Sequence, residues 1–259
     1  VTCGLTLTPG RTNTAMAAEP LTPTANSEDA KLAAFFETHL ERVFQDEPLS
    51  ATLQGDHRFD DRLDDLSPVA REKRIERDRA TLARLPQAVD KAKLSRDAQI
   101  DYEIFEHSLR YGIWLQEHFH PFEEDPRTWG DYISNSIYVL LTQSTLPREK
   151  NLANATARMA FIPKVIETAQ SAIGAAPKVK VETAIRQTQG AIGFYESELF
   201  TLAGVPKGEG VLGDRAAAIV EKLKGYLAFL RETVLPRAKD NWRIGSALFQ
   251  EKLVLELDA

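Results

Sequence analysis

The chain of 259 residues carries 38 acidic and 32 basic side chains, and its net charge of −6 argues against the basic surface that nucleic-acid binding requires. Apolar residues make up 43% of the sequence, enough for a buried core, but no run of about eighteen apolar residues predicts a membrane span. The single cysteine, Cys3, excludes an intrachain disulfide and a cysteine-rich zinc site.

Residues 1–26 differ in composition from the rest of the chain. They are rich in Thr, Ala and Pro and show no helical periodicity. Ala15-Met16-Ala17 has the small-x-small pattern after which signal peptidases cut, so the segment is either a signal-peptide remnant or a disordered tail. The first interpretation predicts a periplasmic or secreted protein. Residues 27–259 are expected to form one helical domain.

From residue 27 onward, apolar residues recur three or four positions apart, which predicts helices throughout. Ser27, Ser67 and Ser95 are expected N-caps, and Pro86 is expected to end the second helix. Residues 120–130 are expected to form a loop. The predicted helices cover residues 28–47, 68–85, 96–119, 131–143, 147–163, 178–201, 212–235 and 242–257. The expected fold is therefore an all-α array of about seven to nine helices.

Two apolar stripes are notable within this pattern. One face of the helix predicted at 96–119 carries Ile100, Ile104, His107, Tyr111 and Leu115. The helix predicted at 242–257 remains strongly apolar to its end, where domains usually become polar. This indicates a surface that another part of a larger structure covers, or one through which the chain self-associates.

Recognisable catalytic motifs are missing from the sequence. None of the five histidines is followed by glutamate, which excludes the H-E-x-x-H motif of helical zinc hydrolases. No nucleophile elbow or phosphate-binding glycine loop is found, and Cys3 lies in the N-terminal segment. We therefore expect no catalytic residue and no metal ligand in this chain.

The polar stretch Gly55–Pro68, GDHRFDDRLDDLSP, is the most distinctive in the sequence. Together with the lead-in PLSATLQ at 48–54, it resembles an early signature of a bacterial family called domain of unknown function 885. Later stretches agree in order, namely W-G-D-Y at 129–132, R-M-A-F-I-P at 158–163 and W-R-I-G-S-A-L-F at 242–249. The resemblance spans about residues 30–257.

Members of that family resemble exported, helical, zinc-peptidase-like proteins of greater length, whose H-E-x-x-P-G-H zinc motif lies in their second half. The resemblance implies that this chain is the N-terminal scaffold and cleft wall of such a hydrolase. Zinc and the C-terminal half would then belong to the full-length protein, and this chain alone would be inactive. The alternative is a self-contained helical module that binds a ligand or a protein without catalysis.

The stretch 55–68 has two interpretations. In the structural one, Arg58 or Arg62 pairs with Asp60, Asp61 or Asp64 and fixes the loop. Asp56 belongs to the same structural set, and Phe59 and Leu63 serve as apolar anchors.

In the other interpretation, residues of this region contact substrate. His57 and Arg58 would face a channel and hold the carboxylate of a peptide. Trp129 and Tyr132, expected as an exposed aromatic pair in a loop, either pack against the domain or line a cleft.

Overall fold

The computed structural model describes residues 27–257, so the predicted N-terminal tail or signal-peptide remnant lies outside the described residues. Nine helices have eleven residues or more: α1 Glu28–Asp46, α3 Pro68–Ala88, α4 Arg96–His118, α6 Pro126–Thr142, α7 Arg148–Met159, α8 Ile162–Ala172, α9 Lys178–Gly193, α11 Gly210–Phe229 and α12 Ser246–Leu257. Three are shorter: α2 Pro48–Leu53, α5 Pro121–Glu124 and α10 Leu199–Ala203. The described part contains no β-strand, which confirms the all-α prediction.

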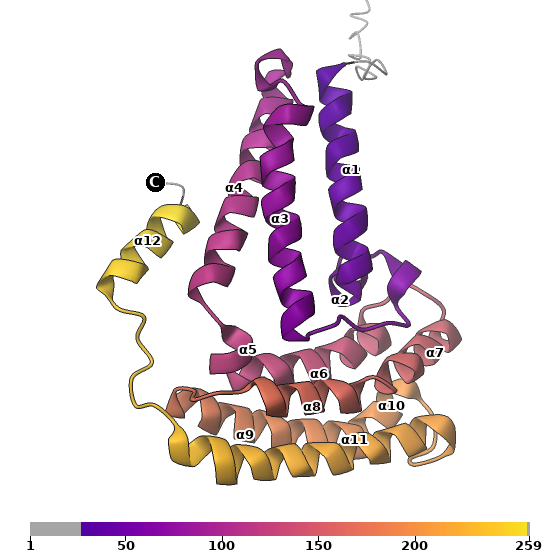
Figure 1. The fold of residues 1–259 in the computed structure, drawn as a ribbon. Helices are drawn as coiled ribbons and strands as arrows, with labels where there is room; N and C mark the ends of the chain where they lie inside the picture. The colour runs from indigo at the N-terminus through magenta and orange to yellow at the C-terminus, as the bar shows by residue number, and fades with distance from the viewer. Residues whose placement is uncertain (1–26, 258–259) are drawn as a thin grey trace, which may run out of the picture.

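The helices form two bodies, an upright group of α1, α3 and α4 and a layered bundle beneath it that includes α6, α8, α9 and α11 (Figure 1). The bundle holds the larger core, with Trp129, Ile133 and Tyr195 among its fully buried side chains. The upright group has a smaller core that includes Leu32 and Leu85. A third cluster, made of Phe44, Ala51 and Phe59, lies where the chain passes from one body to the other.

The three predicted N-caps are confirmed. The side-chain oxygens of Ser27, Ser67 and Ser95 each accept a hydrogen bond from a backbone N–H of the first turn, at 3.2, 3.3 and 3.3 Å. These caps fix where α1, α3 and α4 begin, because a helix start otherwise leaves its N–H groups unpaired.

The predictions made from prolines are partly wrong. Pro86 does not end α3, which continues to Ala88, since a proline in the last turn removes little of the helix. The loop expected at 120–130 is largely helical, because Pro121 and Pro126 each occupy the first position of a helix. Pro163 likewise lies in the first turn of α8 rather than inside the preceding helix.

The apolar stripe predicted on α4 is not its core face. Ile100 and Ile104 are 40% and 59% exposed, whereas Tyr102, Leu109 and Ile113 are buried. α12 begins only at Ser246 and lies apart from the bundle, on the side of α4 (Figure 1).

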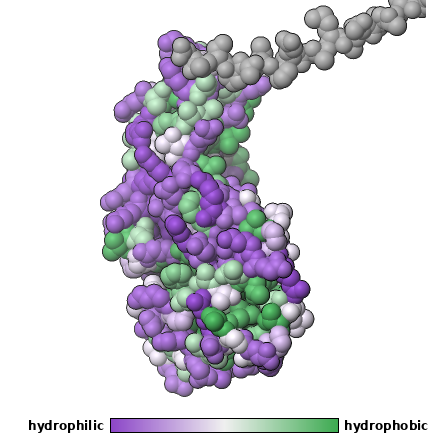
Figure 2. Space-filling view, turned by 90° about the vertical axis from the view of Figure 1, so that its right-hand side faces the viewer, coloured by the Kyte–Doolittle hydropathy of each residue, from purple (hydrophilic) through white to green (hydrophobic). Residues whose placement is uncertain are grey.

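Among the described residues, α12 contributes none to the buried core. The face opposite α12 is mostly hydrophilic, with apolar side chains in separate patches (Figure 2). No helix in the described part of the chain has the length and apolar character needed to cross a membrane.

Candidate functional site

The polar loop begins with a tight turn after α2. Gly55 has φ 84°, a left-handed conformation that favours glycine. Asp56 then accepts a hydrogen bond from the backbone N–H of Arg58 at 3.1 Å and so caps the short 3₁₀ helix His57–Phe59. The Phe59 side chain is buried as predicted and anchors the loop at the junction of the two bodies.

Arg58 is held on the outside of this turn. Its guanidinium donates to Asp56 at 2.6–3.0 Å and to Glu41 of α1 at 2.6 Å. The partners are therefore Asp56 and Glu41, whereas the sequence predicted Asp60, Asp61 or Asp64. Neighbouring Arg58 holds the pKa of the Asp56 carboxyl below its usual range, which is the electrostatic signature of this pair.

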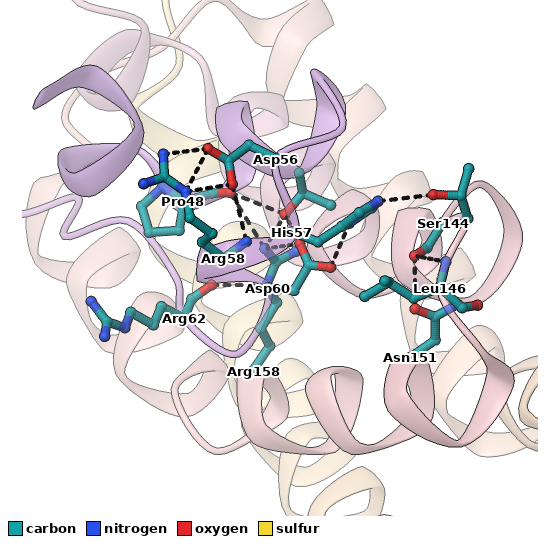
Figure 3. Close-up of polar contacts among 12 residues, drawn as sticks. Pro48, Asp56, His57, Arg58, Asp60, Arg62, Ser144, Leu146, Asn151 and Arg158 are labelled. Atoms are coloured by element: carbon teal, nitrogen blue, oxygen red, sulfur yellow. Dashed lines mark hydrogen bonds and ion pairs between the residues drawn. The ribbon is translucent and has the colours of Figure 1, made fainter. Parts of the chain in front are cut away.

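His57 and Asp60 connect the loop to the bundle (Figure 3). The Asp60 side chain is fully buried and lies 2.8 Å from Nδ1 of His57. Nε2 of His57 lies 3.1 Å from the hydroxyl of Thr145, in the turn between α6 and α7. That turn is itself fixed, because Ser144 donates to Asn151 of α7 at 2.7 Å. The imidazole thus bridges two segments far apart in sequence.

Arg158 of α7 is the centre of the network and is fully buried. Its guanidinium donates to the carbonyl oxygens of Arg62 and Ser136 at 2.8 and 2.9 Å. It also donates to the hydroxyl of Thr52, at 2.5 Å, and Thr52 in turn donates to Asp60 at 2.6 Å. Burial lowers the pKa of Arg158, and the nearby Asp60 carboxylate opposes that effect.

Sequence reasoning missed Arg158 as a site residue. It belongs to the stretch 158–163 that resembles the family, but its partners Thr52 and Arg62 lie 106 and 96 residues away in sequence, beyond any local pattern. The signal that could have found it is its helical register, because Arg158 lies on the same buried face of α7 as Ala155 and Met159, where an arginine is rare.

The rest of the predicted structural set plays a smaller part. The side chains of Asp61 and Arg62 are 58% and 62% exposed and lie 3.8 Å apart, so they form only a surface pair. The structure thus brings Asp56, Asp60 and His57 together in the loop. Arg62 contributes its backbone carbonyl rather than its side chain.

The aromatic pair is not an exposed loop pair, so that prediction is wrong. Trp129 lies in the first turn of α6, is completely buried and donates its Nε1–H to the carbonyl of Phe122 at 2.8 Å. Tyr132 is half-buried, and its hydroxyl accepts from the backbone N–H of Asp64 at 2.7 Å. Burial raises the pKa of both Tyr132 and Asp64.

A cavity of about 780 Å³ lies between the upright helices and the bundle. Tyr132 and Asp64 line it, together with residues of α1, α3, α4 and α5. Its volume is in the range of small-molecule sites, about 300–1,000 Å³. His57, Arg58 and Trp129 do not line this cavity. Of the four residues predicted to contact substrate, Tyr132 alone borders it.

The described residues do not fit a zinc site. Within residues 27–257, no three His, Cys, Asp or Glu side chains come together in an arrangement that could hold a metal ion. The clustered acidic residues of the loop are already engaged, Asp56 by Arg58 and Asp60 by His57 and Thr52. The polar contacts of the loop therefore stabilise the junction of the two helical bodies.

Fold and site together define an all-α domain that has a buried ionic network in its polar loop and, separately, a ligand-sized cavity. The chain belongs to the family described as "Bacterial protein of unknown function (DUF885)", which matches residues 48–259. No match was found among curated proteins.

A solved structure shares the fold, that of a "putative lipoprotein of unknown function" from Shewanella oneidensis. The TM-score is 0.77 at 22% sequence identity, and the match covers 88% of this chain but 42% of that one. This chain therefore corresponds to less than half the length of that protein.

Proposed function

We propose that residues 27–257 form the helical, non-catalytic scaffold of a larger exported hydrolase of the zinc-peptidase type. In this proposal the chain supports the catalytic part and contributes one wall of the substrate cleft, where Tyr132 lies. The zinc ligands and the catalytic glutamate are assigned to a part of the protein outside the described residues. No reaction step is assigned to His57 or Arg58, which hold the loop.

The observation that carries this proposal is the uncovered apolar surface of the last segment. Trp242, Phe249 and Leu257 are 57%, 51% and 67% exposed, and none of the α12 residues is buried. Exposed apolar patches of this kind mark interaction surfaces. The segment lies within the family match, and the related solved chain is much longer than this one. Both facts support a covering partner within the same protein.

The description of the related structure supports the location. That protein is described as a "putative lipoprotein", a description that indicates a location outside the cytoplasm. We propose by analogy that this protein also works outside the cytoplasm, in the periplasm or as a secreted protein.

The coding sequence beyond the codon for Ala259 tests the proposal. We expect the reading frame to continue into an H-E-x-x-P-G-H motif, and the longer protein to hydrolyse peptides in a zinc-dependent manner. A stop codon at this position, with a chain that is monomeric by light scattering and binds no apolar dye, would contradict it.

The second candidate function is a self-contained binding module. The observation that favours it is the cavity of about 780 Å³, whose walls all come from this chain. Such a module would bind its ligand without any additional domain. Peptide hydrolysis by the longer protein distinguishes the two candidates, because only the scaffold proposal requires it.

A further inference from the structure

A hollow of about 340 Å³ lies between α6 and α9, and its volume is within the range of small-molecule sites, about 300–1,000 Å³. It shares no lining residue with the larger cavity between the upright helices and the bundle. None of its lining residues takes part in the network around Arg158. The hollow is therefore a separate feature of the bundle surface.

The hollow has one polar end and one aromatic end. At the first, the side chains of Asp131 of α6 and Gln187 of α9 are joined by a hydrogen bond of 3.1 Å. At the second, the ring centroids of Tyr138 of α6 and Phe194, which follows α9, lie 6.5 Å apart. Seven residues separate the two ends on each side, which corresponds to about 10.5 Å at a rise of about 1.5 Å per residue. A ligand that reaches both ends must therefore be about 10 Å long.

Asp131 gives the polar end a negative charge. It is exposed, and it is the only charged residue among those of the described chain that line the hollow. Gln187 donates to one of its carboxylate oxygens, and within residues 27–257 Asp131 makes no ion pair. Arg127, one turn earlier on α6, is held by Asp125 at 2.6 Å. The carboxylate of Asp131 is thus open to a cationic group of a ligand.

The aromatic end presents apolar surface at a fixed position. The Tyr138 side chain is 40% exposed, and Phe194 is half-buried beside it. Phe194 begins a π-helical turn, Phe194–Glu198, a widened turn that is frequent at functional sites. The next residue, Tyr195, is completely buried and donates its hydroxyl proton to the carbonyl of Ile133 at 2.9 Å, which anchors the turn. An aromatic side chain of a ligand finds two ring surfaces here.

Gly190 of α9 keeps the space between the two ends open. A Cβ added at this position would meet no atom within 4 Å, and the φ angle of Gly190 is not in the left-handed region. Glycine inside a helix is less stable than alanine. Neither packing nor backbone conformation requires glycine here, so the fold alone does not explain why the hollow is left open.

Asn135 lies between the two ends, one turn after Asp131, and also lines the hollow. Its side chain is exposed and makes no hydrogen bond with the described residues. A side-chain amide offers both a donor and an acceptor, the combination that pairs with the N–H and C=O groups of a peptide. In a polyproline II segment, residues i and i+3 lie on the same side of the peptide, about 9.3 Å apart. That separation is close to the distance between the two ends of the hollow.

We propose that the hollow between α6 and α9 binds a peptide segment in which a basic side chain lies three residues away from an aromatic one. The basic side chain donates to Asp131, and the aromatic side chain packs on Tyr138 and Phe194. Asn135 pairs with the peptide backbone between them. The net charge of −6 favours the approach of a cationic peptide. Every contact comes from this chain, so the inference does not depend on the proposed zinc hydrolase.

Isothermal titration calorimetry of the chain with three capped tetrapeptides tests the assignment. Acetyl-Arg-Ala-Ala-Phe-amide is expected to bind saturably. Acetyl-Glu-Ala-Ala-Phe-amide is expected to bind about tenfold more weakly, because repulsion from Asp131 replaces attraction. Acetyl-Arg-Phe-Ala-Ala-amide has the same composition but places the two side chains next to each other, and it is expected to bind about fivefold more weakly. No saturable binding of the first peptide at millimolar concentration overturns the inference, and so does equal affinity for all three.

The variant Asp131→Asn tests the polar end. The side chain is exposed, and asparagine keeps an oxygen that accepts from Gln187, so the variant is expected to fold. It should reduce the preference for the arginine peptide over the glutamate peptide to less than about threefold. An unchanged preference places the basic side chain elsewhere and refutes the assigned orientation.

Two glycine variants locate the binding. Gly190→Phe is expected to fill the hollow and to abolish binding of the arginine peptide. The matched control is Gly225→Phe in α11, where an added Cβ also meets no atom within 4 Å and which does not line the hollow. This control is expected to keep the wild-type affinity. Unchanged affinity in a folded Gly190→Phe chain, or an equal loss in both variants, contradicts the location, and Asp131→Asn decides the question if Gly190→Phe does not fold.

Discussion

Replacing Arg158 by methionine tests whether the buried network holds the two helical bodies together. The substitution keeps a long side chain but removes the charge and all the donors of the guanidinium. It leaves the carbonyl oxygens of Arg62 and Ser136 without their donor, and it leaves Asp60 buried without a neighbouring positive charge.

The expected loss in the free energy of unfolding follows from that uncompensated carboxylate. Removing one member of a buried ion pair costs about 3–5 kcal/mol. Asp60 keeps its bonds to Thr52 and His57, and its oxygen lies 3.9 Å from Arg158, so the lower end applies. We therefore expect a loss of about 3 kcal/mol for Arg158→Met.

Urea unfolding followed by far-ultraviolet circular dichroism measures this loss. The matched control is Arg62→Met, which removes an exposed side chain and is expected to change stability by less than about 0.5 kcal/mol. In the double variant Arg158→Met/Asp60→Asn, the loss in the free energy of unfolding should be about 1–3 kcal/mol smaller than the sum of the losses in the two single variants, because the two residues interact. A variant Arg158→Met within about 1 kcal/mol of the wild type would refute a stabilising role of the network.

Three further predictions concern packing, pH and the exposed surface. Gly213→Ala in α11 places Cβ 2.3 Å from the backbone of Gly208 and should lower the free energy of unfolding by about 1–3 kcal/mol. Gly190→Ala in α9 adds a Cβ that meets no atom within 4 Å and should raise the free energy of unfolding by about 0.5–1 kcal/mol. Burial raises the pKa of Asp64 in the folded protein, so the stability that its protonated form contributes is lost as pH rises through the folded pKa. Asp64→Asn cannot ionise, and its stability should therefore increase relative to that of the wild type from about pH 4 upward. Phe249→Ser should reduce binding of an apolar fluorescent dye while changing stability by less than about 0.5 kcal/mol.

Each of these predictions has a contradicting result. Equal effects of the two glycine substitutions in urea unfolding would show that the contact between Gly213 and Gly208 relaxes freely. A stability difference between Asp64→Asn and the wild type that does not change with pH would mean that folding leaves the pKa of Asp64 unshifted. Dye fluorescence unaffected by Phe249→Ser would show that α12 is not the exposed apolar surface.

The helical class and the starts of α1, α3 and α4 could be predicted from sequence because both depend on local patterns. Ser27, Ser67 and Ser95 cap helices through contacts three residues away. Proline was ambiguous, because it ends helices in their interior but begins them at the first position. Because of that ambiguity, the segment 120–130 was predicted as a loop although most of it is helical. The Trp129 side chain was therefore predicted to be exposed although it is buried.

The candidate site was less predictable because its contacts are non-local. The motif 55–68 identified the loop, but Arg158, about a hundred residues away, supplies the guanidinium that the sequence assigned to Arg58 or Arg62. Periodicity on α4 gave the right helix but the wrong core face, since Ile104 is exposed and Tyr102 buried. Which face is covered depends on neighbouring helices, and no single-helix pattern contains that information.

The central claim is that this chain is a non-catalytic helical part of a larger zinc-dependent hydrolase. Metal analysis and a peptide-hydrolysis assay on the purified chain, each with added zinc, test it most directly. The account predicts zinc well below one ion per chain and no hydrolysis. One tightly bound zinc per chain, together with peptide hydrolysis that a chelator abolishes, would contradict it.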